Sequence, residues 1–295
     1  MDIIKINNAT KYYLIKKNKF YANNNISFNI KQGDIVGFLG KNGAGKTTLI
    51  KSICNLIKLD SGSISIKNKE INKNPKVVHD NIGVVLEGAR NLYNFLTVDY
   101  NLRYFSYLNK IKDSQLELRI KNLLEMFELL EKRKEVVNNL SRGMQQKVAI
   151  IIAMLKNPDI LILDEPTLGL DIVSKTKMKI LLKTLKDKYK KTIIISSHDL
   201  DVIENVCNKV VIFEKGKVIK YGSISDLKLK ESENRYEIIL KSSEAVNLKD
   251  ISYEKEERII KLETANLKEI LNKINMNSII KIEKKVKSYA HLYLT

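Results

Sequence analysis

The sequence predicts an α/β fold: a mostly parallel sheet with antiparallel strands at the N-terminus, a helical insertion and a small C-terminal α+β domain. Three patterns lead to this prediction. Short, continuously apolar segments recur along the chain, which is typical of strands buried on both faces of a sheet. Helical stretches separate several of them, as crossover connections between parallel strands require. A block of helical periodicity at about 98–156 lies between the two halves of the sheet.

The first strands are expected at residues 2–6 and 26–30, where apolar and polar positions alternate. Residues 35–39 (IVGFL) form a continuous apolar run between Gly33 and Gly40, the pattern of a fully buried strand. Because they are short and β-branched, three later apolar runs also favour strands over buried helices. These runs are 160–163, 192–196 and 209–213.

The helices follow from apolar residues at three- and four-residue spacing. The first helix should come directly after the glycine-rich loop at 40–48, and others are expected near 172–189 and 199–207. The apolar side of the first helix is expected to hold Leu49, Ile50, Ile53 and Leu56 or Ile57. In the central block the repeating positions are Leu116, Ile120, Leu123, Leu124, Phe127 and Leu130.

The last part of the chain shows a weaker pattern of its own. Strands are expected at 236–240, 258–262 and 278–282, with a helix near 265–275. We therefore expect a first domain at 1–222, with a helical subdomain at about 87–157, and a small α+β domain at 223–295. No low-complexity linker marks the boundary between them.

Composition restricts the class of protein. Of the 295 residues 44% are hydrophobic, which suffices for a large core, and no apolar run approaches the roughly 20 residues that span a bilayer. The net charge of +18 suits a polyphosphate, RNA or an anionic membrane as partner, or simply a solvated lysine-rich surface. The two cysteines match no metal-site spacing, and the N-terminus lacks the form of a signal peptide. We expect a soluble, cytoplasmic protein with reduced thiols.

The strand at 35–39 runs into GKNGAGKTT, which fits the phosphate-loop pattern G-x-x-x-x-G-K-[ST] in its required strand–loop–helix context. Glycines let backbone N–H groups face an anion, and the helix N-terminus adds its dipole. Lys46 is expected to reach the β- and γ-phosphates, and Thr47 to ligate Mg²⁺. The predicted nucleotide-binding residues are Gly40, Lys41, Asn42, Gly43, Ala44, Gly45, Lys46, Thr47 and Thr48.

Acidic residues end the apolar strand in ILILDEP at 160–166. Asp164 is expected to act on Mg²⁺ through its water shell, and Glu165 to orient or deprotonate the attacking water. His198, in SSHDL after the strand at 192–196, should lie on the ligand side of the sheet, where it could touch the γ-phosphate. A lone histidine is also common as a structural residue.

The segment LSRGMQQK at 140–147 places a serine and a glycine at the mouth of an expected helix. No histidine or acid nearby would make Ser141 a nucleophile. Its hydroxyl and the N–H groups around Gly143 can form an anion site at a helix N-terminus, or Ser141 can be an ordinary helix cap.

Together, the phosphate loop, the acidic pair and LSRGMQQK resemble the nucleotide-binding domain of ABC transporters, over roughly residues 2–222. The resemblance implies that a short segment binds the γ-phosphate of ATP held by the opposing subunit. Its residues are Ser141, Arg142, Gly143 and Met144. The resemblance also implies that Tyr13 stacks on adenine, with Tyr12 as the weaker candidate. Asp171, with Gly169 and Leu170, matches the loop that bridges the two active sites of a dimer.

Three positions depart from the family pattern. Glu87, in VVLEGARN, stands where the family usually has Gln; a carboxylate there can still face Mg²⁺. Arg142 replaces a Gly and Met144 replaces a Gln of the usual LSGGQ-like segment. Arg142 could add positive charge near the phosphates or point to solvent. These departures leave ATP binding expected and put the turnover rate in question.

The resemblance implies an ATPase that uses Mg²⁺, dimerises with a second copy or a paralogue, and acts on a membrane permease subunit at the inner face of the cell membrane. Residues 223–295, ending in SYAHLYLT, resemble more weakly the small C-terminal domain of drug- and antibiotic-export ATPases. This favours an exporter.

Two other functions stay open. A soluble ABC ATPase acting on nucleic acid or the ribosome would suit the charge. Against it, only one phosphate loop occurs, and the 118-residue interval from Lys46 to Asp164 is too short for a coiled-coil arm. Nucleic acid is therefore not the expected partner. The second alternative, a regulatory or immunity module that binds ATP with little turnover, is suggested by Glu87 and Met144.

Overall fold

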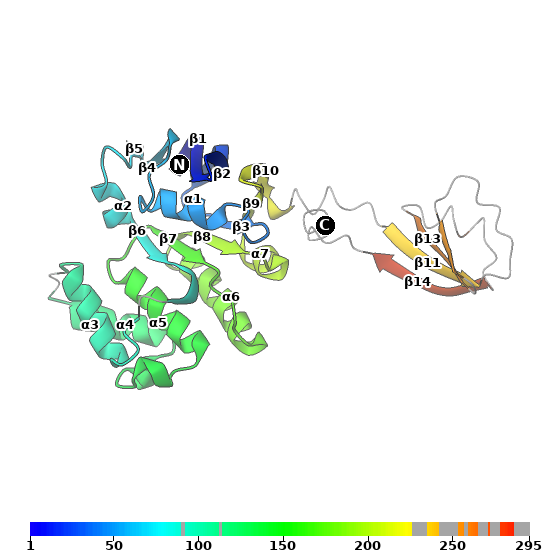
Figure 1. Ribbon diagram of the computed structural model, residues 1–295. Coiled ribbons are helices and arrows are strands. Elements are labelled where there is room, and N and C mark those ends of the chain that lie inside the picture. The colour runs from blue at the N-terminus through cyan, green and yellow to red at the C-terminus, as the bar shows by residue number, and fades with distance from the viewer. Residues whose placement is uncertain are drawn as a thin grey trace. The chain divides into compact units, whose positions relative to one another are not determined.

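The computed structural model divides into two compact units, Met1–Ile224 and Ser225–Thr295, and each is described by itself. The described residues are 1–89, 92–111, 114–225, 235–241, 253–256, 259–264, 271 and 278–285. Figure 1 labels the helices and strands of both units.

A six-stranded, mostly parallel sheet forms the centre of the first unit, in the order β10-β9-β3-β8-β7-β6. Five strands are parallel: β3 (Ile35–Leu39), β6 (Ile82–Val85), β7 (Ile160–Asp164), β8 (Thr192–Ser197) and β9 (Lys209–Glu214). The edge strand β10 (Lys217–Ser223) pairs antiparallel with β9. Every residue of β3, β7 and β8 is buried, as their continuous apolar sequences predict.

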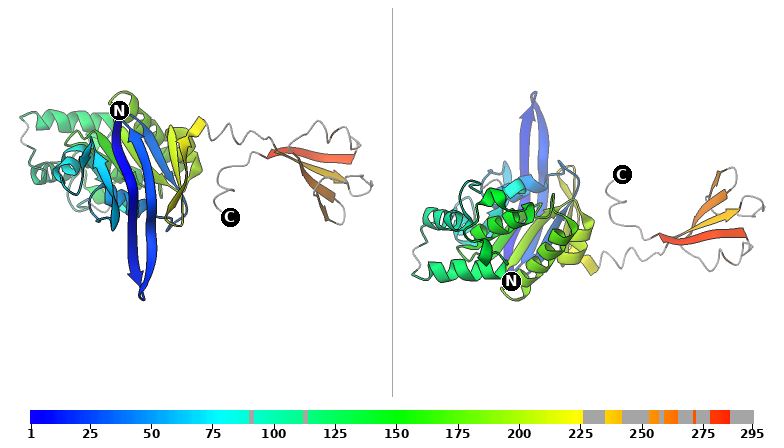
Figure 2. Two further views of the ribbon diagram at one scale, coloured as in Figure 1. Left: turned by 90° about the horizontal axis from the view of Figure 1, so that it is seen from above. Right: turned by 90° about the horizontal axis from the view of Figure 1, so that it is seen from below.

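A second, antiparallel sheet has the order β2-β1-β4-β5. Its strands are β1 (Asp2–Ile15), β2 (Asn18–Lys31), β4 (Ser61–Ile66) and β5 (Lys69–Glu70). The first two are much longer than the predicted strands, and Figure 2 shows their hairpin extending beyond the rest of the unit. Lys16 and Lys17 both have positive φ, 46° and 69°, as the two-residue turn of a twisted hairpin requires.

The main core lies between the two sheets, around α1 (Lys46–Ile53). Leu49, Ile50 and Ile53 of this helix are fully buried, and Phe38 packs its ring against Phe28 and Phe213 at centroid distances of 5.9 and 5.1 Å. The prediction that this helix continues through Leu56 or Ile57 is wrong. The helix ends at Ile53, and Leu56 is exposed, because Asn55 adopts a left-handed conformation that turns the chain away.

The helical subdomain lies between β6 and β7 in the sequence. Its main helices are α3 (Val98–Leu108), α4 (Leu116–Met126) and α5 (Arg142–Met154), and the short turns η2 (Leu130–Lys132) and η3 (Val137–Asn139) lie between α4 and α5. Thr97 caps α3 by accepting a hydrogen bond from the backbone N–H of Tyr100. Arg133 bonds both Asp99 and Glu117, which ties α3 to α4 and lowers the pKa of Glu117 to about 2.

Among the described residues of the first unit there are four further helical elements: α2 (Lys76–Asn81), η1 (Glu87–Ala89), α6 (Ile172–Asp187) and α7 (Leu200–Val206). Helices α5, α6 and α7 lie on the face of the parallel sheet opposite α1 (Figure 1). Gly37 of β3 permits the close approach of α7, since a Cβ there would lie 2.6 Å from a methyl group of Ile203.

The second unit contains a four-stranded antiparallel sheet in the order β12-β13-β11-β14. Its strands are β11 (Arg235–Lys241), β12 (Tyr253–Glu256), β13 (Ile259–Thr264) and β14 (Ile279–Lys285). The three predicted strands correspond to β11, β13 and β14, and β12 was not predicted. The helix expected near 265–275, apart from residue 271, and the ending SYAHLYLT lie outside the described residues.

A search for membrane-crossing helices within the described ranges finds no helix of sufficient length and apolarity.

We predict that Gly83→Ala destabilises the first unit by about 1–3 kcal/mol, because overpacking at a buried contact carries a cost of this size. A Cβ at Gly83 would lie 2.3 Å from the carbonyl oxygen of Ala153, so β6 and α5 would have to separate. Urea denaturation measures the change. Gly222→Ala is the matched control, since a Cβ there meets nothing within 4 Å. Equal stability of the two variants would contradict this view of the β6–α5 contact.

Candidate active site

The loop at residues 40–48 connects β3 to α1. Gly43 and Gly45 have positive φ, 80° and 106°, which side chains rarely tolerate. A Cβ on Gly45 would also lie 2.2 Å from the carbonyl oxygen of Ala22. The loop therefore needs glycine at position 45 both for its conformation and for its contact with β2. It leads into the N-terminus of α1, where the first backbone N–H groups have no hydrogen-bond partner within the helix.

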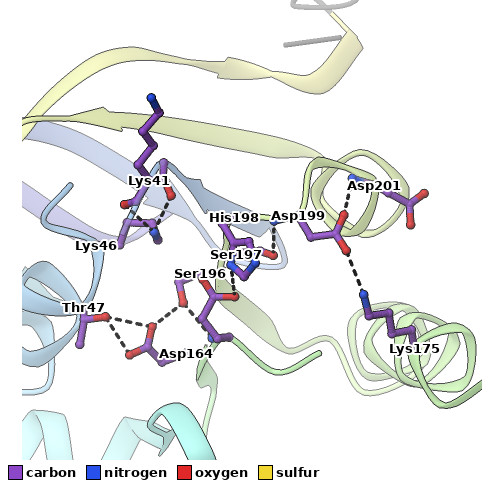
Figure 3. A network of polar contacts seen from close by, with 12 residues as sticks. Lys41, Lys46, Thr47, Asp164, Lys175, Ser196, Ser197, His198, Asp199 and Asp201 are labelled. Atoms are coloured by element: carbon purple, nitrogen blue, oxygen red, sulfur yellow. Dashed lines mark hydrogen bonds and ion pairs between the residues drawn. The ribbon is translucent and has the colours of Figure 1, made fainter. Parts of the chain in front are cut away.

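Lys46 lies folded over this loop. Its Nζ donates hydrogen bonds to the carbonyl oxygens of Gly40 and Lys41, at 2.6 and 3.1 Å (Figure 3). The residue is only 6% exposed, and burial lowers the pKa of its ammonium group, while the charges of Glu165, Asp164 and Glu87 act in the opposite direction. A buried cation among carboxylates, at the mouth of a helix, is suited to an anionic ligand.

Asp164 is the centre of a hydrogen-bonded network at the end of β7. Thr47 Oγ1 donates to its carboxylate at 3.0 Å, and Ser196 Oγ donates to it from β8 (Figure 3). The same serine oxygen accepts the backbone N–H of Glu165 at 2.9 Å. Ser196 therefore positions both acidic residues. Ser196 was not predicted from the sequence, although its place at the end of a buried strand was a usable signal.

The oxygen atoms in this network fit Mg²⁺. That ion takes hard oxygen ligands, retains several waters, and is commonly held by one or two carboxylates together with substrate phosphates. The Thr47 hydroxyl and the Asp164 carboxylate are already adjacent. Glu87, at the start of η1, is exposed and lines a pocket that Lys46 and Thr47 also line. The structure thus brings Thr47 and Asp164 into contact, and Mg²⁺ binding by Thr47, Asp164 and Glu87 stays a prediction.

Glu165 pairs with His198. The Nδ1 atom of His198 lies 3.2 and 3.1 Å from the two carboxylate oxygens, and the glutamate side chain is 9% exposed. Burial raises the pKa of Glu165, while the hydrogen bond from His198 lowers it. The backbone of Glu165 has a φ of 51°, a strained conformation for this residue type. A carboxylate in this environment is suited to accepting a proton.

A pocket of about 320 Å³ opens above the phosphate loop. Its lining residues are Tyr13, Phe20, Ala22, Asn42, Gly43, Ala44, Gly45, Lys46, Thr47, Thr48, Glu87 and Glu165. Tyr13 and Phe20 are direct cross-strand partners in the hairpin, so both rings border the pocket. Tyr12 instead packs against Tyr21. Phe20 was missed because its position depends on the hairpin register, which the sequence does not reveal.

The LSRGMQQK segment lies outside this pocket. Ser141 is exposed and caps α5 by accepting the N–H of Met144 at 3.3 Å. Gly143 lies against Ser174 of α6, where a Cβ would be 3.0 Å from the serine oxygen. Ser174 donates to Asp171, and these bonds lower the pKa of that carboxyl.

Arg142 is exposed. Its guanidinium lies against Gly169, since a Cβ there would be 3.1 Å from Nη1. The segment that begins α5 and the loop that precedes α6 are therefore packed together. None of the residues Ser141, Arg142, Gly143, Met144 and Asp171 lines the pocket of the same chain.

Comparisons with known proteins identify the family. Residues 23–168 match the family model of the ABC transporter. The chain is 35% identical over 225 residues to the ABC transporter ATP-binding protein NatA of Bacillus subtilis, which covers 76% of this chain and 91% of that protein. The chain belongs to the ABC transporter family. It is the ATP-binding subunit of such a transporter and an ATPase.

Other relatives agree with this assignment. Methionine import ATP-binding protein MetN 2 of Bacillus cereus is 34% identical over 229 residues, which is 76% of this ABC subunit and 67% of that protein. The solved structure of cbiO1 from Clostridium perfringens matches with a TM-score of 0.71 and 28% identity, over 78% of this chain and 91% of that one. The dimeric cassette MJ0796 bound to ADP and Pi matches with a TM-score of 0.68 and 31% identity, over 75% and 98%. The predicted family and fold class are confirmed.

We predict that Ser196→Ala lowers the turnover of this ABC ATPase at saturating MgATP about tenfold or more, equivalent to about 1.4 kcal/mol. The change leaves the N–H of Glu165 unpaired and removes the Ser196 hydrogen bond to the Asp164 carboxylate, which keeps its bond from Thr47. Phosphate release measures the rate. Ser106→Ala is the matched control, because Ser106 is equally buried but bonds only the Leu102 carbonyl of its own helix. Wild-type turnover in Ser196→Ala would contradict a positioning role for this serine.

Proposed function

We propose that this ATP-binding subunit drives export through a membrane permease, by MgATP-dependent closure of a dimer in which each nucleotide is bound by both chains. The proposed dimer rests on one observation. The N-terminus of α5, with the exposed Ser141, lies outside the pocket of its own phosphate loop. One chain thus presents two half-sites, each able to bind part of a nucleotide.

The charges of the two half-sites are complementary to one shared ligand. Backbone N–H groups of the phosphate loop and the Lys46 ammonium offer donors to the phosphates from one side. The α5 N-terminus, with Arg142 beside it, adds positive potential from a second chain. The structure of MJ0796 is described as a dimer in a post-hydrolysis state. A nucleotide between two chains contacts both half-sites, so it would be bound more tightly than by either half-site alone.

The hydrolytic step follows from the side chains at the end of β7. Water attacks the γ-phosphorus, its proton passes to the Glu165 carboxylate, and the bond to the ADP oxygen breaks. His198 keeps that carboxylate oriented through its Nδ1 contact. Bound Mg²⁺, held through Thr47 and Asp164 with Glu87 nearby, would offset phosphate charge. Loss of the γ-phosphate removes the anion that joins the half-sites, so the dimer opens.

An aromatic patch on the helical subdomain is the surface we assign to the permease. It consists of Tyr93, Phe95, Tyr100, Tyr104 and Tyr107, all exposed, with Phe95 at 91% and Tyr107 at 82%. Tyr100, Tyr104 and Tyr107 share one face of α3. Large exposed aromatic groups mark interaction sites, because their burial contributes most of the binding energy of many interfaces.

A groove beside the patch supports the same assignment. A cavity of about 390 Å³ lies between the core and the helical subdomain, lined by residues of α2, β6, α3 and α5. Phe105 lines this groove and also packs against Tyr93 and Tyr104 of the patch. Motion between the core and the helical subdomain would therefore change the groove shape, which suits transmission of the nucleotide state to a cytoplasmic helix of a permease.

The export direction rests on the weaker resemblance of residues 223–295 to export ATPases, and one relative is named for methionine import. Inverted membrane vesicles that contain the complex test the direction. ATP should drive candidate cargo into the vesicle lumen. ATP-driven loss of cargo from the lumen would mean that the subunit belongs to an importer.

We predict that Glu165→Gln retains MgATP and accumulates as a dimer, because the amide keeps the shape of the side chain but cannot accept the proton of water. Size-exclusion chromatography with and without MgATP measures the oligomeric state. Lys46→Ala should remain monomeric under the same conditions, since it loses the phosphate contact. A Glu165→Gln chain that stays monomeric with saturating nucleotide would count against the shared site.

We also predict that Phe95→Asp or Tyr107→Asp lowers sedimentation of the chain with permease-containing membranes about tenfold, as loss of a central aromatic contact does at other interfaces. Basal ATPase activity should be unchanged, because neither side chain lines the nucleotide pocket. Tyr189→Asp alters an exposed aromatic residue outside the patch and serves as control. Equal sedimentation of all variants would exclude the patch as the docking surface.

A further inference from the structure

Two consecutive carbonyl groups of the phosphate loop are held by hydrogen bonds from other parts of the chain. The Ala44 carbonyl accepts the N–H of Gly216, from the β9–β10 turn, at 3.0 Å. The Gly45 carbonyl accepts Nδ2 of Asn23, from β2, also at 3.0 Å. The two flanking elements are themselves joined, because Asn24 N–H donates to the Gly216 carbonyl at 2.7 Å.

Together with the helix hydrogen bond from the Leu49 N–H to the Gly45 carbonyl, these bonds orient the adjacent N–H groups. In a trans peptide the C=O and the N–H of one plane point in opposite directions. Holding the Gly45 carbonyl against β2 therefore directs the N–H of Lys46 away from β2. Holding the Ala44 carbonyl against the β9–β10 turn likewise directs the N–H of Gly45 away from that turn. Both N–H groups belong to the loop that lines the pocket.

A purely structural role does not explain an asparagine at position 23. Asn23 is fully buried, and its Oδ1 accepts no hydrogen bond within the described part of the chain. A buried, unpaired acceptor lowers stability. The Gly45 carbonyl would stay satisfied without Asn23, because it also accepts the N–H of Leu49 at 3.0 Å. An apolar residue at position 23 would thus serve the fold at least as well.

We propose that Asn23 is a positioning residue of the phosphate loop. Its side-chain amide fixes the Gly45–Lys46 peptide so that the Lys46 N–H faces the phosphates, and it strengthens that N–H as a donor by polarising the peptide. The inference rests on residues 40–48 as the nucleotide site. Asn23 acts through the loop and does not itself contact the nucleotide.

The test compares Asn23→Leu and Asn23→Ala with the wild-type chain. Binding of MgATP and of Mg-tripolyphosphate, which has no base or sugar, is measured by calorimetry, and the Tm of the ligand-free protein by thermal unfolding. Both variants should weaken both ligands about tenfold. The Tm of Asn23→Leu should equal or exceed that of wild type, because the unpaired acceptor is gone. Asn29→Leu, an exposed position of the same strand, should leave binding unchanged.

Tripolyphosphate separates this role from adenine recognition, because Tyr13→Ala should weaken MgATP alone. Wild-type affinity of Asn23→Leu for tripolyphosphate would overturn the proposal. A loss of affinity accompanied by a lower Tm in Asn23→Leu would also overturn it, since the residue would then be structural. If Lys46→Ala bound tripolyphosphate as wild type does, the assignment of residues 40–48 as the nucleotide site would itself be wrong, and the inference would fall with it.

Discussion

Parallel pairing of β3 and β7 with β8 is the constraint on which the site depends. The register places Leu39 opposite Ser197 and Asp164 opposite Ser196. Because the carboxyl ends of parallel strands meet at one edge, residues more than a hundred positions apart in sequence arrive at the same place. The loop after β3, the acidic pair after β7 and the histidine after β8 then need only local geometry to form one site. The continuous burial of these three strands is what holds the register.

Electrostatics explains why this site binds an anion. Lys46 is withdrawn from water among three carboxylates, and in the ligand-free protein it satisfies its donors on loop carbonyls. A phosphate group offers the same ammonium a charged partner, with helix-end N–H groups around it. The helix mouth at Ser141 has similar chemistry but faces outward, beyond the reach of this pocket. Under the proposed function, this arrangement gives the ATP a direct role in holding two chains together.

The sequence predicted most of the parallel sheet, because strands buried on both faces have unmistakable apolar runs. It underestimated the β1–β2 hairpin, whose outer half is rich in Lys, Tyr and Asn and is exposed. The phosphate loop, Asp164 and Glu165 follow local motifs, and the structure brings them together at one edge of the sheet. Ser196, Phe20 and Asn23 act through contacts between segments distant in sequence, which no local pattern contains. The same reason left β4, β6 and β10 unpredicted, since short strands depend on their neighbours.

The most direct test of the shared site is complementation between two inactive chains. Lys46→Ala lacks the phosphate contact, and Gly143→Arg blocks the helix mouth, so each alone should show almost no MgATP turnover. In an equal mixture, each mixed dimer holds one intact site where a wild-type dimer holds two. Turnover should therefore recover, to at most about half of the wild-type value, as a two-fold symmetric interface requires. A mixture as inactive as its components would contradict the claim that each nucleotide is bound by both chains.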